Sequence, residues 1–246
     1  MELIILGHVI GDFYVQTDKI AERKKNSIKY MLIHCLLYTI VIGIGAYILC
    51  RDVIKTVIVS LLIFFSHLVI DLLKRKMDKK AKNCEYIIFL GDQLLHIASL
   101  FLIFCVIKQP IYFKCDWMVN DLNVNKCIAI AIAILICWKP AAIFVSLIFK
   151  IIPETIEQAN ETNKVSEKIE KEGAKIGSWI GILEREIILI LGLMGQFGAI
   201  GFVLTAKSLA RFKQLENKSF AEKYLVGTLL SAFISIVCIA LYKINC

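Results

Sequence analysis

The chain has 246 residues, of which 58% are hydrophobic, and its mean hydropathy is +0.72. Since a globular domain contains about 45–50% apolar residues, this composition excludes a disordered chain and disfavours both a soluble enzyme and a secreted disulfide scaffold. The net charge of +8 is also seen in nucleic-acid-binding proteins, but in so apolar a chain it favours segments that touch an anionic lipid surface.

Long apolar runs predict an all-α, polytopic membrane protein, folded as a helical bundle. A helix of about 20 apolar residues crosses the hydrocarbon core of a bilayer. Residues 1–16 are shorter than this and lack the pattern of a cleaved signal peptide, so we expect a short retained helix that crosses only partly. The six longer runs predict six spans, at residues 28–49, 53–73, 86–107, 126–152, 176–206 and 223–244.

The basic residues between these runs indicate which side of the membrane each segment faces. Segments 18–29 and 74–85 hold five and six lysines and arginines, whereas segments 50–55 and 108–126 hold two and three. Because cytoplasmic loops carry the excess of positive charge, we expect segments 18–29 and 74–85 in the cytoplasm, in a protein of the plasma membrane.

The second half of the chain does not follow this rule. Segment 206–223 carries five basic residues, yet simple alternation of the spans places it outside. Either the glycine-broken run 176–206 re-enters without crossing, or the run kinked at Pro140 does not cross. The topology after residue 126 therefore stays open.

We expect two regions in the chain. The first, 1–125, carries the histidines and aspartates described next. The second, 126–246, holds an amphipathic helix of mixed charge at 153–175 and a basic loop at 206–223.

All four histidines lie within or beside apolar runs, and three of them have an aspartate four residues away. The seven residues are His8 with Asp12 in GHVIGDF, His67 with Asp71 in HLVID, Asp92 with His96 in GDQLLH, and His34 alone. Positions i and i+4 of a helix share one face, so each pair presents an imidazole and a carboxylate together. Every one of the seven lies at the helix end next to a segment expected in the cytoplasm. The four segments therefore predict one shared site.

These residue types indicate a metal site. An aspartate within a bilayer costs about 2.5–3.5 kcal/mol on insertion scales, so three of them need compensation. Imidazoles and carboxylates are ligands of zinc, iron and manganese. Seven candidates exceed the four ligands of a structural zinc, so we expect one or two divalent ions, zinc before manganese or iron, with Gln16 and Gln93 adding hydrogen bonds. A metal-free network between helices and a path for ions or protons stay open as alternatives.

The cysteines do not point to a metal or to disulfides. None of the nine forms a CxxC pair, and most lie in or at the ends of apolar runs. We interpret them as small apolar residues.

The distal half has a second, weaker cluster. Gly173, Gly177 and Gly181 recur every fourth residue, which is typical of a helix-packing face in lipid. Glu184 and Arg185 follow within an apolar run, and as sequence neighbours they face different directions. Their candidate partners are Lys207, Arg211 and Glu222. The functional alternative is a basic segment that holds an anionic lipid headgroup or a phosphate.

GHVIGDFYVQTDKIAERK, HLVIDLLK and GDQLLH, together with His34, resemble a bacterial membrane-protein family named domain of unknown function 3307. IGILERE and AIGFVLTAKSLARFKQLENKSFAEKYLVGTLLS resemble the C-terminal part of its longer members, while residues from about 100 to 170 carry no resemblance. The HxxxD pattern is more loosely similar to membrane-bound metal-dependent hydrolases. These resemblances imply an integral membrane protein and favour a metal site, but they imply no substrate.

The leading hypothesis is a metal-dependent hydrolase. The seven histidines and aspartates are its candidate ligands, and one of Asp12, Asp71 and Asp92 would serve as the general base. The basic segments favour an anionic lipid or phosphorylated substrate, and no nucleic acid is expected as a partner. The alternatives are a metal or proton transporter or sensor, which the apolar far halves of the early spans disfavour, and a membrane scaffold without catalysis.

Overall fold

The computed structural model describes residues 2–80, 84–107, 124–151 and 164–245. Every regular element in these residues is a helix, which confirms the predicted all-α fold. Five helices are long and apolar enough to cross a membrane: Ile28–Cys50, Val53–Asp78, Glu85–Val106, Val124–Phe149 and Lys218–Ile244. They correspond to five of the six predicted spans and are consistent with an integral membrane protein.

The chain divides into two compact units, Met1–Leu135 and Ile136–Cys246. Helix α6 (Val124–Phe149) runs through the boundary, and Pro140 lies inside it without ending it. The predicted boundary after residue 125 stays a prediction.

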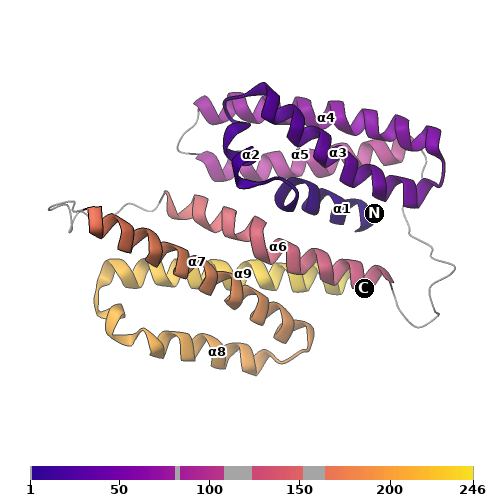
Figure 1. Cartoon of the computed structure of the whole chain (residues 1–246). Coiled ribbons are helices and arrows are strands. Elements are labelled where there is room, and N and C mark those ends of the chain that lie inside the picture. The colour runs from indigo at the N-terminus through magenta and orange to yellow at the C-terminus, as the bar shows by residue number, and fades with distance from the viewer. Residues whose placement is uncertain (1, 81–83, 108–123, 152–163, 246) are drawn as a thin grey trace. The chain divides into compact units, whose positions relative to one another are not determined.

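The described part of unit 1 before α6 consists of helices, and the last three of these are long and run side by side (Figure 1). In chain order they are α1 (Glu2–Val9), the π-helical turn η1 (Ile10–Tyr14), α2 (Asp18–Arg23), α3 (Ile28–Cys50), α4 (Val53–Lys80) and α5 (Glu85–Val106). Only two residues separate α3 from α4, and Arg51 between them takes a left-handed conformation with φ of 48°. This tight turn folds α3 and α4 into an antiparallel hairpin.

Glycines allow α1 and η1 to lie close against α3. A Cβ atom on Gly11 would stand 2.9 Å from Cδ2 of Tyr38, and one on Gly7 would stand 3.5 Å from Cγ1 of Ile42. Small residues at a helix interface permit such close approach of two backbones. The two glycines stand next to His8 and Asp12, so this contact brings the polar residues of the first segment up to α3.

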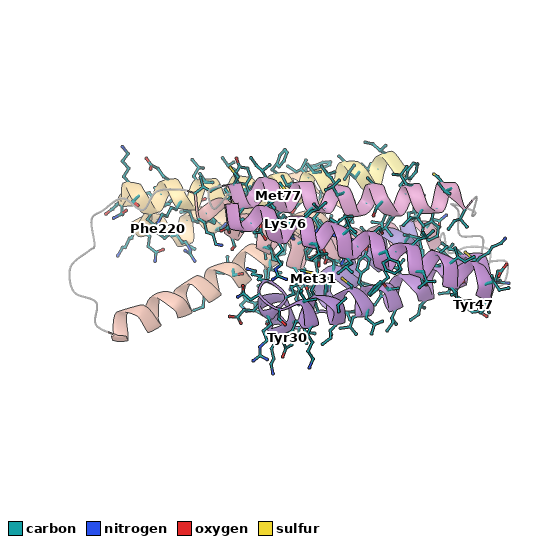
Figure 2. All side chains as sticks on the ribbon, turned by 90° about the horizontal axis from the view of Figure 1, so that it is seen from above. Tyr30, Met31, Tyr47, Lys76, Met77 and Phe220 are labelled. Atoms are coloured by element: carbon teal, nitrogen blue, oxygen red, sulfur yellow. The ribbon has the colours of Figure 1, made fainter. Side chains whose placement is uncertain are left out.

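The outer surfaces of the long helices are apolar. On α3 the residues Leu32, Leu36, Ile40, Ile44 and Ile48 follow one another at intervals of four, and all are exposed. Figure 2 shows such side chains standing out from the helices, with Tyr30 and Tyr47 toward opposite ends of α3. A continuous apolar face of this extent is unusual for a protein surrounded by water and suits contact with lipid.

The two basic segments are largely helical, which corrects the prediction of loops at 18–29 and 74–85. α2 begins after Thr17, whose hydroxyl accepts a hydrogen bond from the backbone N–H of Ile20. α4 continues past the predicted end at residue 73 to Lys80, because lysine, arginine and methionine are good helix formers. Lys76 of this extension lies toward the same end of unit 1 as Tyr30, opposite to Tyr47 (Figure 2).

Unit 2 corrects the predicted span at 176–206. Its further elements are α7 (Lys164–Leu193), α8 (Phe197–Ala210), the 3-10 turn η3 (Phe212–Glu216) and α9 (Lys218–Asn245). The run 176–206 is split between α7 and α8, because Gly195 takes a φ of +73° that glycine adopts without steric cost. α8 folds back against α7, so the run reverses direction (Figure 1). Re-entry of this run without crossing stays a prediction.

Two further predictions concern segments of unit 2. The mixed-charge helix predicted at 153–175 is helical from Lys164 onward as part of α7, while residues 153–163 lie outside the described residues. The prediction of a loop at 206–223 is wrong, because these residues form the end of α8, the η3 turn and the start of α9.

Candidate metal centre

Four segments of unit 1 bring all seven predicted residues to one place in its interior. α1 and η1 supply His8 and Asp12, α3 supplies His34, α4 supplies His67 and Asp71, and α5 supplies Asp92 and His96. All seven are between 0% and 5% exposed. The structure therefore places three carboxylates and four imidazoles in a space from which most solvent is excluded.

Asp12, His34 and His67 form the first group that can hold a metal ion. The Nε2 atom of His34 lies 3.1 Å from Nε2 of His67 and 3.2 Å from Oδ1 of Asp12. One ligand atom from each residue lies within 4.8 Å of the others. Two imidazole nitrogens and one carboxylate oxygen thus converge, which is the donor set of many zinc and iron sites.

Asp71, Asp92 and His96 form the second group. The Nε2 atom of His96 lies 3.4 Å from Oδ1 of Asp92 and 3.8 Å from Oδ1 of Asp71. Both His96 Nε2 and Asp92 Oδ1 are buried without a hydrogen-bond partner. Unsatisfied buried polar atoms are rare and costly, and a divalent cation between them would satisfy both, so these residues fit a metal ion.

The Asp71 carboxylate of the second group also faces the first group. Its Oδ2 atom is 3.6 Å from His34 Nε2 and 3.9 Å from His67 Nε2, on the side of the first group. Its Oδ1 atom faces His96 of the second group. A carboxylate that presents one oxygen to each of two neighbouring ligand groups is suited to bridge a pair of ions.

Cys35 belongs to a third group that overlaps the other two. Its thiol is fully buried, and its sulfur lies within 4.8 Å of ligand atoms of His67 and Asp71. Our interpretation of the cysteines as apolar filling missed this position. The available signal was only that Cys35 directly follows His34 in the chain.

His8 lies outside these three groups. Its Nδ1 atom is 3.0 Å from the hydroxyl of Tyr38, and its Nε2 atom is 3.1 Å from Oε1 of Gln93. Both ring nitrogens are therefore engaged, so the structure places His8 beside the ligand groups and not among them.

Gln93 connects the two ligand groups. Its amide nitrogen donates to Oδ2 of Asp12 over 3.0 Å and to Oδ2 of Asp92 over 3.1 Å. Carboxylates only accept hydrogen bonds, so the amide orientation is determined, and its oxygen must accept from His8. The Tyr38 hydroxyl then donates to the other nitrogen of His8. Gln16 takes no comparable part, since its Oε1 atom is buried without a hydrogen-bond partner.

Tyr38 also orients the histidine rings. Its ring stacks on that of His67 with centroids 3.7 Å apart and an angle of 21° between the planes. The ring of His67 in turn stacks on that of His96, with centroids 4.3 Å apart. Sequence reasoning missed Tyr38, although it follows His34 by one helical turn.

Two lysines contact the carboxylates. Lys24 Nζ lies 3.4 Å from Asp71 Oδ2, and Lys74 Nζ lies 2.7 Å from Asp92 Oδ2. Their side chains are 15% and 25% exposed, so each reaches from the surface into the site. In the sequence these residues only indicated which side of the membrane their segments face.

Unit 2 contains a separate network of buried charges. Glu184 forms an ion pair with Lys207, which also donates to Thr228 over 2.8 Å. Arg185 Nε donates to the backbone oxygen of Cys137 over 2.7 Å, and its Nη1 atom donates to the Ser231 hydroxyl over 3.3 Å.

The other two candidate partners in unit 2 lie elsewhere. The Arg211 guanidinium stands 5.9 Å from the centre of the Phe220 ring, and Glu222 is exposed. Of the three candidates, Lys207 alone contacts Glu184 or Arg185 among the described residues. A bound lipid headgroup or phosphate at this network stays a prediction.

Residues 1–120 match the family described as "Protein of unknown function (DUF3307)". The matched region contains every histidine and aspartate of the two ligand groups. No curated protein and no solved structure matches the chain. The looser similarity to membrane-bound hydrolases stays a prediction.

Proposed function

We propose that residues 1–120, the part of the chain that belongs to the DUF3307 family, form a membrane-embedded metal site that hydrolyses a phosphorylated or lipid-like substrate. The membrane would be the plasma membrane, with the basic segments 18–29 and 74–85 in the cytoplasm. The observation that carries the proposal is the position of Asp71, whose two oxygens face the two ligand groups.

Each group would hold one divalent ion, with zinc as the first candidate. Asp12, His34 and His67 would bind the first ion, Asp92 and His96 the second, and Asp71 would bridge the two. Paired ions of this kind polarise a phosphoryl or acyl oxygen and make a water molecule nucleophilic. A carboxylate oxygen of Asp12 or Asp92 that does not bind an ion would accept the proton from that water as the general base.

Unsatisfied atoms in the site argue against a purely structural network. The Nδ1 atoms of His34 and His67, as well as Asp92 Oδ1 and His96 Nε2, are buried without hydrogen-bond partners. A network that serves only to hold helices together is stable when all its members are satisfied. A cation bound between His96 Nε2 and Asp92 Oδ1 would give both of these unpartnered atoms a partner.

The apolar core of unit 1 argues against a transport path. On one side of Tyr38 the described interior is filled by buried apolar residues from α1, α3, α4 and α5. They are Ile4, Ile42, Ala46, Val59, Ile63, Leu100 and Phe104. An ion that crosses a bilayer needs polar groups along its way, so this packing supports a site that opens to one side only.

Elemental analysis of the purified full chain in lipid nanodiscs tests the metal. We expect about two zinc, manganese or iron ions per chain, removable with a chelator. A wild-type protein that takes up no metal, and whose stability is unchanged by His67→Ala, would overturn the proposal.

Release of inorganic phosphate tests the reaction. The metal-loaded protein should hydrolyse p-nitrophenyl phosphate or phosphatidic acid in nanodiscs, and the chelated protein should not. An Asp71→Asn variant should lose this activity. Metal uptake without hydrolysis of either compound would leave a metal-binding protein and would refute the hydrolase.

A further inference from the structure

Lys24 and Lys74 stand between the ligand groups and the surface. Their side chains are 15% and 25% exposed, whereas those of the six ligands are at most 7% exposed. The two lysines come from different segments, one after α2 and one from α4. A molecule that reaches the ions from the surface would therefore meet these two ammonium groups first.

Both lysines contact carboxylates that the ions would bind. Lys24 contacts Asp71 Oδ2 and Lys74 contacts Asp92 Oδ2. When a cation binds these carboxylates, it competes with the ammonium groups for the same negative charge. The two ammonium groups would then lie beside the ions, and each would need a new anionic partner.

The charge balance indicates how strongly charged this partner is. With neutral histidines, the three carboxylates and two lysines give the site a charge of −1, and two divalent ions would change it to +3. Uncompensated charge is expensive in a buried, lipid-surrounded site. A neutral ester would leave this charge unchanged, whereas a phosphate monoester with two negative charges would remove most of it.

We propose that Lys24 and Lys74 form the binding site for the phosphoryl group of the substrate, in front of the two ions. This inference rests on the proposed function, and it narrows the substrate class to phosphate monoesters, either a lipid headgroup or a soluble compound. Lysine ammonium groups are common ligands of phosphate oxygens, and hydrogen bonds to charged groups are among the strongest in proteins.

Titration with inorganic phosphate, followed by calorimetry on the zinc-loaded full chain, tests the inference. A Lys24→Gln, Lys74→Gln double variant should bind phosphate at least about tenfold more weakly, while its zinc content stays that of the wild type. Lys55→Gln is the matched control, because Lys55 pairs with Asp52 on the surface of the α3–α4 turn. Equal phosphate affinity of the double variant and the wild type, both zinc-loaded, would overturn the inference and leave the metal site standing.

Two additional measurements complete the experiment. If the double glutamine variant does not fold, the single variants Lys24→Gln and Lys74→Gln should each bind phosphate more weakly than the wild type. Lys74→Arg, which keeps the positive charge, should bind phosphate more tightly than Lys74→Gln. Nanodiscs with and without phosphatidic acid identify the source of the phosphoryl group. Competition by phosphatidic acid indicates a lipid headgroup, and its absence indicates a soluble phosphate compound. A wild type without metal overturns the proposed function and this inference together.

Discussion

The side chains of His34 and His67 point their Nε2 atoms at each other across 3.1 Å in the interior of unit 1. At this distance one nitrogen must carry a proton and the other must accept it. For both Nε2 atoms to hold a divalent ion, this proton would have to move to the Nδ1 atom of the same ring or leave the site. Metal and proton therefore compete for the same two atoms.

This competition predicts that metal affinity falls as the pH is lowered, because protonated imidazoles do not bind cations. Titration with zinc at several pH values, followed by calorimetry, should show weaker binding and more protons released per zinc as the pH is lowered. A His34→Ala variant should lose the ion of the first group, whereas Tyr47→Phe on the exposed far end of α3 should keep the wild-type content. A pH-independent affinity would contradict this assignment.

Asp71 and Asp12 should differ in how many ions depend on them. Asp71 faces both ligand groups, whereas Asp12 contacts His34 of the first group. Asp71→Asn is expected to reduce binding of both ions, and Asp12→Asn is expected to remove one and leave the other. The measurement is the number of ions per chain by mass spectrometry. Equal stoichiometry in the two variants would show that Asp71 does not bridge.

His8 should support the site without binding metal. A His8→Ala variant leaves Gln93 Oε1 without its donor, so the amide that holds Asp12 and Asp92 becomes less well oriented. We expect unchanged stoichiometry but roughly 10–100-fold weaker metal affinity, as for other residues that orient ligands. If His8→Ala instead lowers the number of ions bound, His8 is a ligand after all.

Gly11 should tolerate no larger side chain. The Cβ atom of a Gly11→Ala variant would lie 2.9 Å from Cδ2 of Tyr38, which forces η1 away from α3. Overpacking of this kind costs about 1–3 kcal/mol, and the metal affinity should fall with it because Asp12 moves. Thermal unfolding with and without zinc measures both effects.

Gly91 provides the matched control for Gly11. It directly precedes Asp92 in the helix α5, but a Cβ atom there meets nothing within 4 Å. Gly91→Ala should therefore leave metal binding unchanged and stabilise the helix by up to about 1 kcal/mol. Equal loss of stability in the two variants would show that the contact with Tyr38 does not decide the effect.

The ion pair of Glu184 and Lys207 should stabilise unit 2. The Glu184 side chain is 4% exposed, so Lys207→Gln leaves a buried carboxylate without its cation. Breaking a buried pair costs up to about 3–5 kcal/mol, and a Glu184→Gln, Lys207→Gln double variant should recover part of it. Lys213→Gln on the exposed η3 turn is the control. Unfolding in denaturant measures these differences, and a Lys207→Gln variant as stable as the wild type would refute the role.

The amino-acid sequence alone determined the helical class, five of the spans and the seven polar residues that gather in unit 1. These features depend on local properties of the chain. The length of an apolar run predicts a membrane span. The cost of placing an ionisable side chain in lipid makes residues such as His8 and Asp12 stand out within these runs. The family of residues 1–120 was also recognisable from the short motifs around them.

The tertiary structure decided which atoms of these residues meet. The rotation of each helix about its axis places Tyr38 and Gln93 against His8. It also directs one oxygen of Asp71 to each of the two ligand groups. Lys24 and Lys74 contact the carboxylates for the same reason. Spacing along the chain determines which residues share a face of one helix. It does not determine which face meets a neighbouring helix or where a side chain ends, because these depend on packing between segments far apart in the sequence.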